Sequence, residues 1–286
     1  MTRYHAALLL LAVLTGILAL GARQAVAEDG VEISPGDWRI NISNWRDPEL
    51  RGAIDDSDRL ERRDLSLAAD WQINGFEAGF LYAHQPVLVR SGDPASNGYF
   101  HQLNLIYGQR FGQAHFRVVG GLHGSSNMFK HMDFHRDGLV GSFSLLWVPE
   151  EDLLDAFGVG ADYRFGRFQF YPRMDRAFDF GATVLQVRLP IELSLRDADD
   201  RWSIGFERHG EKWGTLDSDR EVKGATYLSE WRFEVSGLVP IAQRGIRLRL
   251  AAGLSFDTTL RYRDLDRGQV RDRLENAAYG RIAFHW

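Results

Sequence analysis

The segment LSLAADWQINGFEAGFLYAH, residues 65–84, decides the fold class of this chain. Its first half places apolar side chains at every second position from Leu65 to Ile73, and its second half does the same from Phe76 to Tyr82. A period of two indicates a β-strand with one apolar face, whereas a helix repeats about every 3.6 residues. The Asn74-Gly75 pair between the halves is the strongest short sequence signal for a hairpin turn. The segment therefore predicts two antiparallel strands joined by a tight turn.

The same alternation returns along the rest of the chain. We expect twelve strands, near residues 37–45, 63–73, 76–84, 98–109, 114–122, 138–148, 157–165, 178–195, 201–209, 223–236, 246–257 and 275–286. Residue 190 is a proline that could kink the eighth of these, and residues 166–177 could hold another short strand. The connections after odd-numbered strands are longer than those after even-numbered ones, a pattern typical of outer-membrane barrels, which have long external loops and short periplasmic turns.

The two faces of the expected strands differ in chemistry. One face is apolar and includes Trp38, Ile40, Ile42, Phe143, Leu145, Trp147, Ile246, Leu248, Leu250, Leu254, Phe256, Ile282, Phe284 and Trp286. The other face is charged, and we expect it to line a lumen with Arg117, Asp162, Arg164, Arg188, Glu192, Glu207, Glu230, Arg232, Glu234, Arg247, Arg249 and Arg281. A soluble β-sandwich, which would bury the apolar face, is the alternative.

The placement of aromatic residues favours the membrane barrel over the sandwich. Tryptophans and tyrosines fall mostly near strand ends, as the interfacial girdles of membrane barrels require: Trp45, Trp71, Tyr82, Tyr99, Tyr107, Trp147, Tyr163, Trp202, Tyr227 and Trp231. We therefore predict an all-β fold, a single antiparallel up-and-down transmembrane β-barrel of about 12 strands.

The two ends of the chain indicate export. Arg3 precedes an apolar stretch from Ala6 to about Leu20, and Ala25-Val26-Ala27 is a small-x-small cleavage pattern. We interpret residues 1–27 as a signal peptide and residues 28–286 as the barrel; a single membrane helix is the alternative, but the apolar stretch is shorter than the ~20 residues it needs. The last segment, Tyr279 to Trp286, resembles the terminal strand of bacterial outer-membrane β-barrels.

That resemblance implies an outer-membrane location. Its implied partners are the barrel assembly machinery, outer-membrane lipids and lipopolysaccharide. The chain has 34 Lys and Arg residues against 39 Asp and Glu residues, and the expected signal peptide holds two of the arginines. This acidic balance argues against a nucleic-acid partner, and we expect none. Cysteine is absent, which excludes disulfides and thiolate metal sites. We expect no cofactor.

One motif suggests catalysis. The stretch Leu122-His-Gly-Ser-Ser-Asn127 resembles the His-x-Ser-Asn motif of the outer-membrane phospholipase A and lipid A deacylase families. The resemblance implies Ser125 as nucleophile and His123 as base in an outer-leaflet lipid-ester hydrolase. Against it, Ser126 intervenes before Asn127, and regular alternation points His123 into the lumen. The plain alternative is a polar strand end that turns into a loop.

A second candidate site is a metal site on one expected external loop. His131, His135 and Asp137 offer nitrogen and oxygen ligands there, although loop histidines are more often simply solvated.

The charged lumen leaves the function open between two classes. The charges can pair across strands and fill a structural envelope barrel, or they can line a narrow porin-like path for small hydrophilic solutes. A monomeric barrel of one of these two kinds, without catalysis, is the leading hypothesis, and the lipid-ester hydrolase is its rival.

Overall fold

Antiparallel strands make up most of the structure. The computed structural model describes residues 37–45, 50–51, 60–73, 76–89, 98–126, 137–148, 156–216, 222–239, 246–264 and 268–286. The strands are β1 (Asp37–Trp45), β2 (Leu50–Arg51), β3 (Leu60–Ile73), β4 (Phe76–Val89), β5 (Gly98–Phe111), β6 (Ala114–Ser125), β7 (Leu139–Trp147), β8 (Ala156–Asp162), β9 (Gln169–Asp179), β10 (Thr183–Leu189), β11 (Glu192–Asp197), β12 (Trp202–Leu216), β13 (Val222–Val239), β14 (Arg247–Asp264), β15 (Gly268–Leu274) and β16 (Ala277–His285). Within these ranges, no helix has the length and apolar character needed to cross a bilayer.

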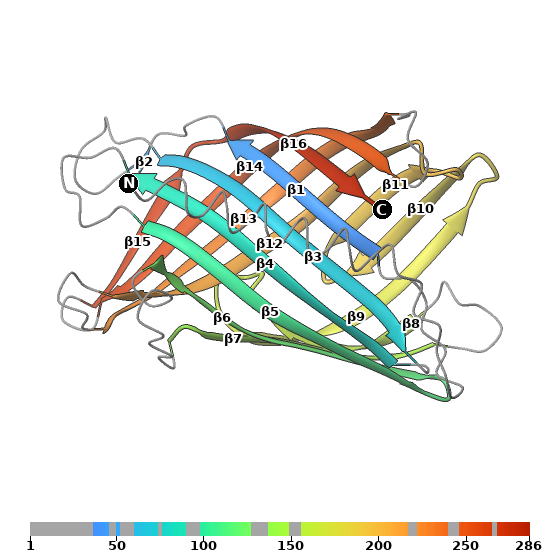
Figure 1. Cartoon of the computed structure of the whole chain (residues 1–286), viewed down its shortest axis with the longest axis horizontal. Coiled ribbons are helices and arrows are strands. Elements are labelled where there is room, and N and C mark those ends of the chain that lie inside the picture. The colour runs from blue at the N-terminus through green and yellow to red at the C-terminus, as the bar shows by residue number, and fades with distance from the viewer. Residues whose placement is uncertain are drawn as a thin grey trace.

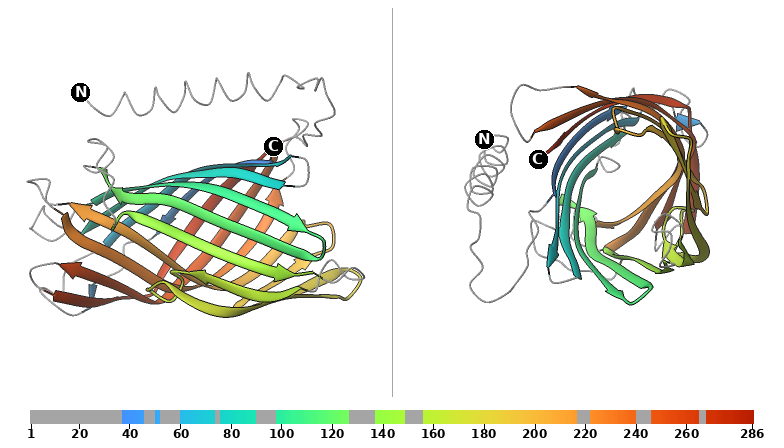
Figure 2. Two further views of the ribbon diagram at one scale, coloured as in Figure 1. Left: turned by 90° about the horizontal axis from the view of Figure 1, so that it is seen from below. Right: turned by 90° about the vertical axis from the view of Figure 1, so that its right-hand side faces the viewer.

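The strands close on themselves. Neighbours in sequence pair from β3 to β14, and β1 pairs with β3 on one side and with β16 on the other. Because β14 pairs with both β13 and β16, the sheet has no seam there. The backbones of Trp38 and Trp286 exchange two hydrogen bonds of 3.1 Å beside this closure. The slanted strands form a cylinder, which Figure 2 shows from the side and end-on, so the polar backbone groups of one strand meet those of the next.

Two of the ring strands are interrupted. The register that pairs Trp45 of β1 with Tyr279 of β16 continues without a shift to Leu50 of β2 and Leu274 of β15. β2 therefore extends β1, and β15 extends β16. Counted this way, the described residues form a ring of fourteen strands, and the predicted number of about twelve is wrong. The predicted all-β, closed, up-and-down antiparallel architecture is confirmed (Figure 1).

The two additional strands lie where two prolines disturbed the pattern. Residues 169–179 form β9, although Pro172 in its middle argues against a strand. The segment expected as one strand over residues 178–195 holds the end of β9 and two further strands, β10 and β11, joined at Pro190-Ile191. The regions expected as long loops around residues 210–222 and 258–274 are mostly strand, because β12, β13 and β14 run further than predicted.

The outer surface of the ring is apolar. Leu105 is 64% exposed, Phe157 58% and Phe170 71%, and each points outward. A water-soluble sandwich would bury such side chains, so the sandwich alternative is wrong. In a bilayer the same side chains contact lipid and the closed ring leaves no free edge.

We name the two ends of the barrel for use below. The terminal end is where β1 begins and β16 ends. The loop end is the opposite one, where β1, β4 and β6 end. The expected signal peptide, residues 1–27, lies outside the described residues.

Candidate functional site: the lumen

The strand register fixes which side chains face the lumen. Ser66 of β3 lines an internal cavity, and it pairs with Ala83, which pairs with Gln102, which pairs with His123. Directly paired residues share a face of the sheet. His123 therefore points into the lumen, as regular alternation of β6 predicts.

The same reasoning places the expected lumen-lining residues. Register puts eleven on the inner face: Arg117, Asp162, Arg188, Glu192, Glu207, Glu230, Arg232, Glu234, Arg247, Arg249 and Arg281. The twelfth, Arg164, follows the end of β8, and its Nε donates a 2.8 Å hydrogen bond to Asp162.

Most of these charges are paired with one another. The Arg117 Nε lies 3.0 Å from Glu77, and Arg188 contacts both Asp175 at 2.7 Å and Glu192 at 2.6 Å. Arg188 links neighbouring strands, and Arg117 reaches Glu77 on β4 past Gly108 of the intervening β5, so these pairs contribute to the wall of the barrel without crossing its interior. Partly exposed pairs of this type stabilise by only about 0–1 kcal/mol each.

One ion pair does cross the lumen. Arg62 of β3 donates to both carboxylate oxygens of Glu230 on β13, at 2.8 and 2.9 Å, and β3 and β13 are not neighbours in the ring. Arg232 binds the same carboxylate at 2.7 Å, and the Thr258 hydroxyl donates to it at 3.3 Å. Glu230 is 1% exposed and Arg62 5%. The group of Arg62, Glu230 and Arg232, which we call the central cluster, therefore divides the lumen.

Between the central cluster and the loop end, β12 leans across the lumen onto β6. Gly214 of β12 pairs in parallel with Gly124 of β6, although five strands, β7 to β11, lie between them in the ring. Two glycines allow this approach because neither carries a side chain. The lean has a cause in strand length: β11 pairs with β12 only as far as Glu207, so the rest of β12 lacks that neighbour.

Polar side chains from other strands form hydrogen bonds with the part of β12 that does not pair with β11. The Nδ1 of His123 contacts the carbonyl oxygen of Lys212 at 3.1 Å, and Nε2 lies 2.7 Å from Asn104 Oδ1. The indole Nε1 of Trp213 donates to Gln85 at 3.1 Å. Gln85 in turn donates to Glu211 at 3.2 Å. All these side chains except that of Glu211 are almost fully buried.

We call the contacts of Gln85 and His123 with residues 211–213, together with the contact between Asn104 and His123, the loop-end closure. Apolar packing supports it, since Trp213, Phe100 and Leu228 form one buried cluster. The described residues thus close the lumen near the loop end by contact between opposite walls.

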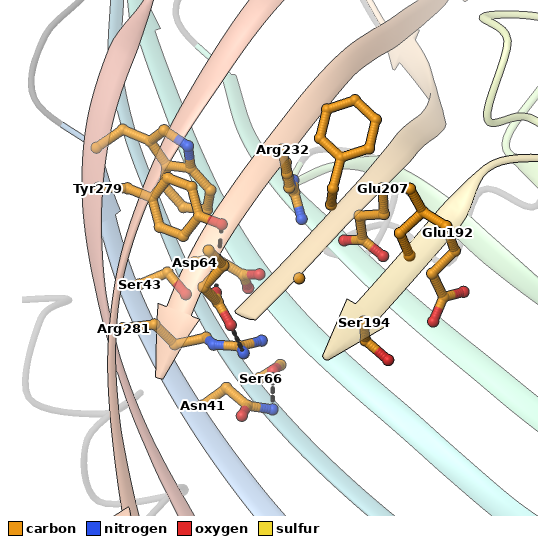
Figure 3. A pocket seen from close by; sticks show the side chains of 15 residues that line it. Asn41, Ser43, Asp64, Ser66, Glu192, Ser194, Glu207, Arg232, Tyr279 and Arg281 are labelled. Atoms are coloured by element: carbon orange, nitrogen blue, oxygen red, sulfur yellow. Dashed lines mark hydrogen bonds and ion pairs between the residues drawn. The ribbon is translucent and has the colours of Figure 1, made fainter. Parts of the chain in front are cut away.

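On the other side of the central cluster the lumen is hollow. A cavity of about 250 Å³ lies there, with Asn41, Ser43, Ser66 and Ser194 as its neutral polar lining and Asp64, Glu192, Glu207, Glu234, Arg232 and Arg281 as its charged lining. Figure 3 shows these side chains converging from opposite strands. Trp45 and Tyr279 form one wall, with their rings stacked 5.1 Å apart.

The expected catalytic pair is not assembled. Both ring nitrogens of His123 are occupied by the loop-end closure, and Ser125 Oγ is buried without a hydrogen-bond partner among the described residues. Ser126, the neighbouring serine, contacts a different histidine, because its Oγ lies 3.0 Å from His101 Nε2. The structure gives the lipid-hydrolase resemblance no support.

The expected metal site falls largely outside the described residues. His131 and His135 lie there, and only Asp137 of the three is described. Within the described ranges, no group of three or more His, Asp or Glu side chains is arranged to hold a metal ion. The loop metal site remains a prediction.

Sequence reasoning found the inner face but missed the contacts that divide the lumen. Arg62, Gln85 and Trp213 were not singled out, although each stands opposite the apolar row of its own strand. Their partners lie 126 to 168 positions away in the sequence, and no local pattern encodes such a distance.

The chain forms a closed antiparallel ring with an apolar exterior and a charged interior. The fold is that of a bacterial outer-membrane β-barrel. An outer-membrane barrel of this size has a lumen of intermediate width, since about eight strands are filled by side chains and about 16–18 leave a wide channel.

Comparison with known proteins adds little to this assignment. No family model matches the chain, and no curated protein matches it. Among solved structures, the crystal structure of the β domain of the Bordetella autotransporter BrkA is similar at 9% sequence identity with a TM-score of 0.30, covering 90% of this chain and 99% of that one.

Proposed function

We propose that this barrel is a narrow porin-like channel for small hydrophilic solutes, closed at its loop end in the conformation described above. The observation that carries the proposal is the contrast between the two halves of the lumen. One half holds a polar cavity of about 250 Å³, and the other is closed by contacts from a single strand, β12.

The nature of the closure supports a channel that can open. The distal part of β12 keeps its ladder with β13 but has no β11 neighbour, so its contact with the opposite wall depends on side-chain hydrogen bonds more than on a strand ladder. Each such hydrogen bond contributes only about 0.5–1.5 kcal/mol. A movement of β12 toward the wall would therefore break few interactions.

The competing function is a structural envelope barrel. The central cluster favours it, because Arg62 and Glu230 join two strands that are not neighbours through two buried hydrogen bonds. The two functions differ in one measurable property, which is ion flow through the purified protein.

Planar-bilayer recording distinguishes them. We would compare the wild type with the double variant Gln85→Ala/Trp213→Ala, which removes the hydrogen bonds of Gln85 with Glu211, Trp213 and Gln102, and also the indole. We expect rare or small current steps from the wild type and frequent, several-fold larger steps from the variant. Gln109→Ala, an outward-facing change on β5, is the matched control and should record like the wild type.

Correct folding of each variant is checked by its heat-dependent gel mobility, a common property of membrane barrels. If the double variant folds and inserts yet passes no current, the channel proposal fails and the structural barrel is favoured.

A further inference from the structure

The carboxylates that line the lumen cavity outnumber the cations left to balance them. Four carboxylates face it, and two guanidiniums do. Arg281 is engaged with Glu234, and Arg232 with Glu230 of the central cluster. Glu192 is bound to Arg188 at 2.6 Å. Asp64 and Glu207 are then the two cavity carboxylates for which the described residues provide no ion pair within 4.0 Å.

One carboxylate oxygen of Asp64 accepts no hydrogen bond from the described residues. This oxygen, Oδ1, is buried. Arg62 and Arg232 act on Asp64 through space, but both bind Glu230 directly, and Glu211 adds a further negative charge nearby. A buried carboxylate in such surroundings needs an explanation, and a bound cation is one.

Glu207 stands in an unfavourable pair. It lies directly opposite Glu192 on the neighbouring strand, with both side chains on the lumen face. Like charges directly opposite each other destabilise a sheet. Arg188 forms an ion pair with Glu192. On the β13 side, Glu207 lies opposite Arg232, but Arg232 forms its ion pair with Glu230.

The remaining lining suits an organic cation. Ser43, Ser66, Ser194 and Asn41 supply neutral hydrogen-bonding groups around the charged ones. The rings of Trp45 and Tyr279 stack to form an aromatic wall, in which the Trp45 ring already carries the Arg62 guanidinium at 4.2 Å. The carboxylates do not converge as metal ligands, since no group of three lies close enough within the described residues. A volume of about 250 Å³ also exceeds what a bare ion needs.

We propose that this cavity binds a small organic cation, an aliphatic amine or diamine, with Asp64 and Glu207 as its anionic partners. The inference deepens the proposed function by naming a solute class, and it is tested by binding in detergent, where no conduction is required. A failure of one proposal therefore does not imply a failure of the other.

The full-length barrel, purified in detergent, is titrated with 1,4-diaminobutane. Calorimetry is the main readout, and the total tryptophan fluorescence, to which the wall residue Trp45 contributes, is the second. 1,4-Butanediol and succinate serve as neutral and anionic probes of similar length. We expect the diamine to bind at least tenfold more tightly than either of these. We also expect Asp64→Asn and Glu207→Gln each to weaken diamine binding at least tenfold, because each removes one charge and keeps the shape.

Asp199→Asn is the matched control, because this side chain is 76% exposed in the turn between β11 and β12. It should bind the diamine like the wild type. Equal affinity for the diamine and the diol would overturn the proposal. So would unchanged diamine affinity in both Asp64→Asn and Glu207→Gln, provided that both variants show the gel mobility of a folded barrel.

Discussion

The cross-lumen ion pair between Arg62 and Glu230 gives the sharpest stability prediction. Arg62→Met removes the two hydrogen bonds of 2.8 and 2.9 Å and keeps the aliphatic stem. Removing one partner of a buried pair costs about 3–5 kcal/mol, because it leaves an uncompensated charge. Here Arg232 still binds Glu230 at 2.7 Å. We therefore expect a loss at the lower end of that range, about 3 kcal/mol of unfolding free energy.

A double-mutant cycle measures the interaction energy between Arg62 and Glu230 separately from their interactions with other residues. Glu230→Gln alone leaves Arg62 and Arg232 facing each other without their shared carboxylate, and we expect a loss of about 3–5 kcal/mol. In the double variant Arg62→Met/Glu230→Gln both charges of the pair are gone. Its loss of unfolding free energy should therefore be smaller than the sum of the two single losses by at least about 2 kcal/mol.

The assay is urea unfolding of the barrel folded into lipid vesicles, followed by tryptophan fluorescence. Arg63→Met, on the neighbouring outward position of β3, is the control for loss of an arginine from this strand. The reasoning is refuted if the single losses add within about 0.5 kcal/mol, as they do for independent sites.

Three further predictions concern the wall. Leu105→Arg, at an outward side chain that is 64% exposed, should lower the unfolding free energy in vesicles by about 2–4 kcal/mol, and an effect below about 1 kcal/mol would place this position outside the bilayer. Gly210→Ala should destabilise the barrel by about 1–3 kcal/mol, because the new Cβ would lie 2.2 Å from the carbonyl oxygen of Tyr163. Gly205→Ala on the same strand is the control, because its new Cβ would meet open space and should cost less. Equal losses of unfolding free energy in urea would contradict this packing. Ser125→Ala should leave lipid A and phospholipid acylation unchanged in a strain that overproduces the protein, and a change measured by lipid mass spectrometry would revive the hydrolase hypothesis.

The wall of the barrel was largely predictable because its pattern is local. The alternation in residues 65–84 already separates Leu65 and Leu67 from Ser66 and Asp70, and the structure pairs β3 with β4 in the register that the Asn74-Gly75 turn implies. Failures came where local signals conflict. Pro172 obscured β9, and Pro190 marks a turn between two short strands where one long strand was expected.

The sequence by itself determined which side chains face lipid and which face inward, because that choice repeats every two residues along each strand. Only the tertiary structure decided whether the lumen is open. The loop-end closure depends on β11 beginning only at Glu192, beside Glu207, and the central cluster joins residues 168 positions apart. Both depend on how the ring closes and on the relative lengths of its strands, and these are properties of the whole barrel that no single segment carries.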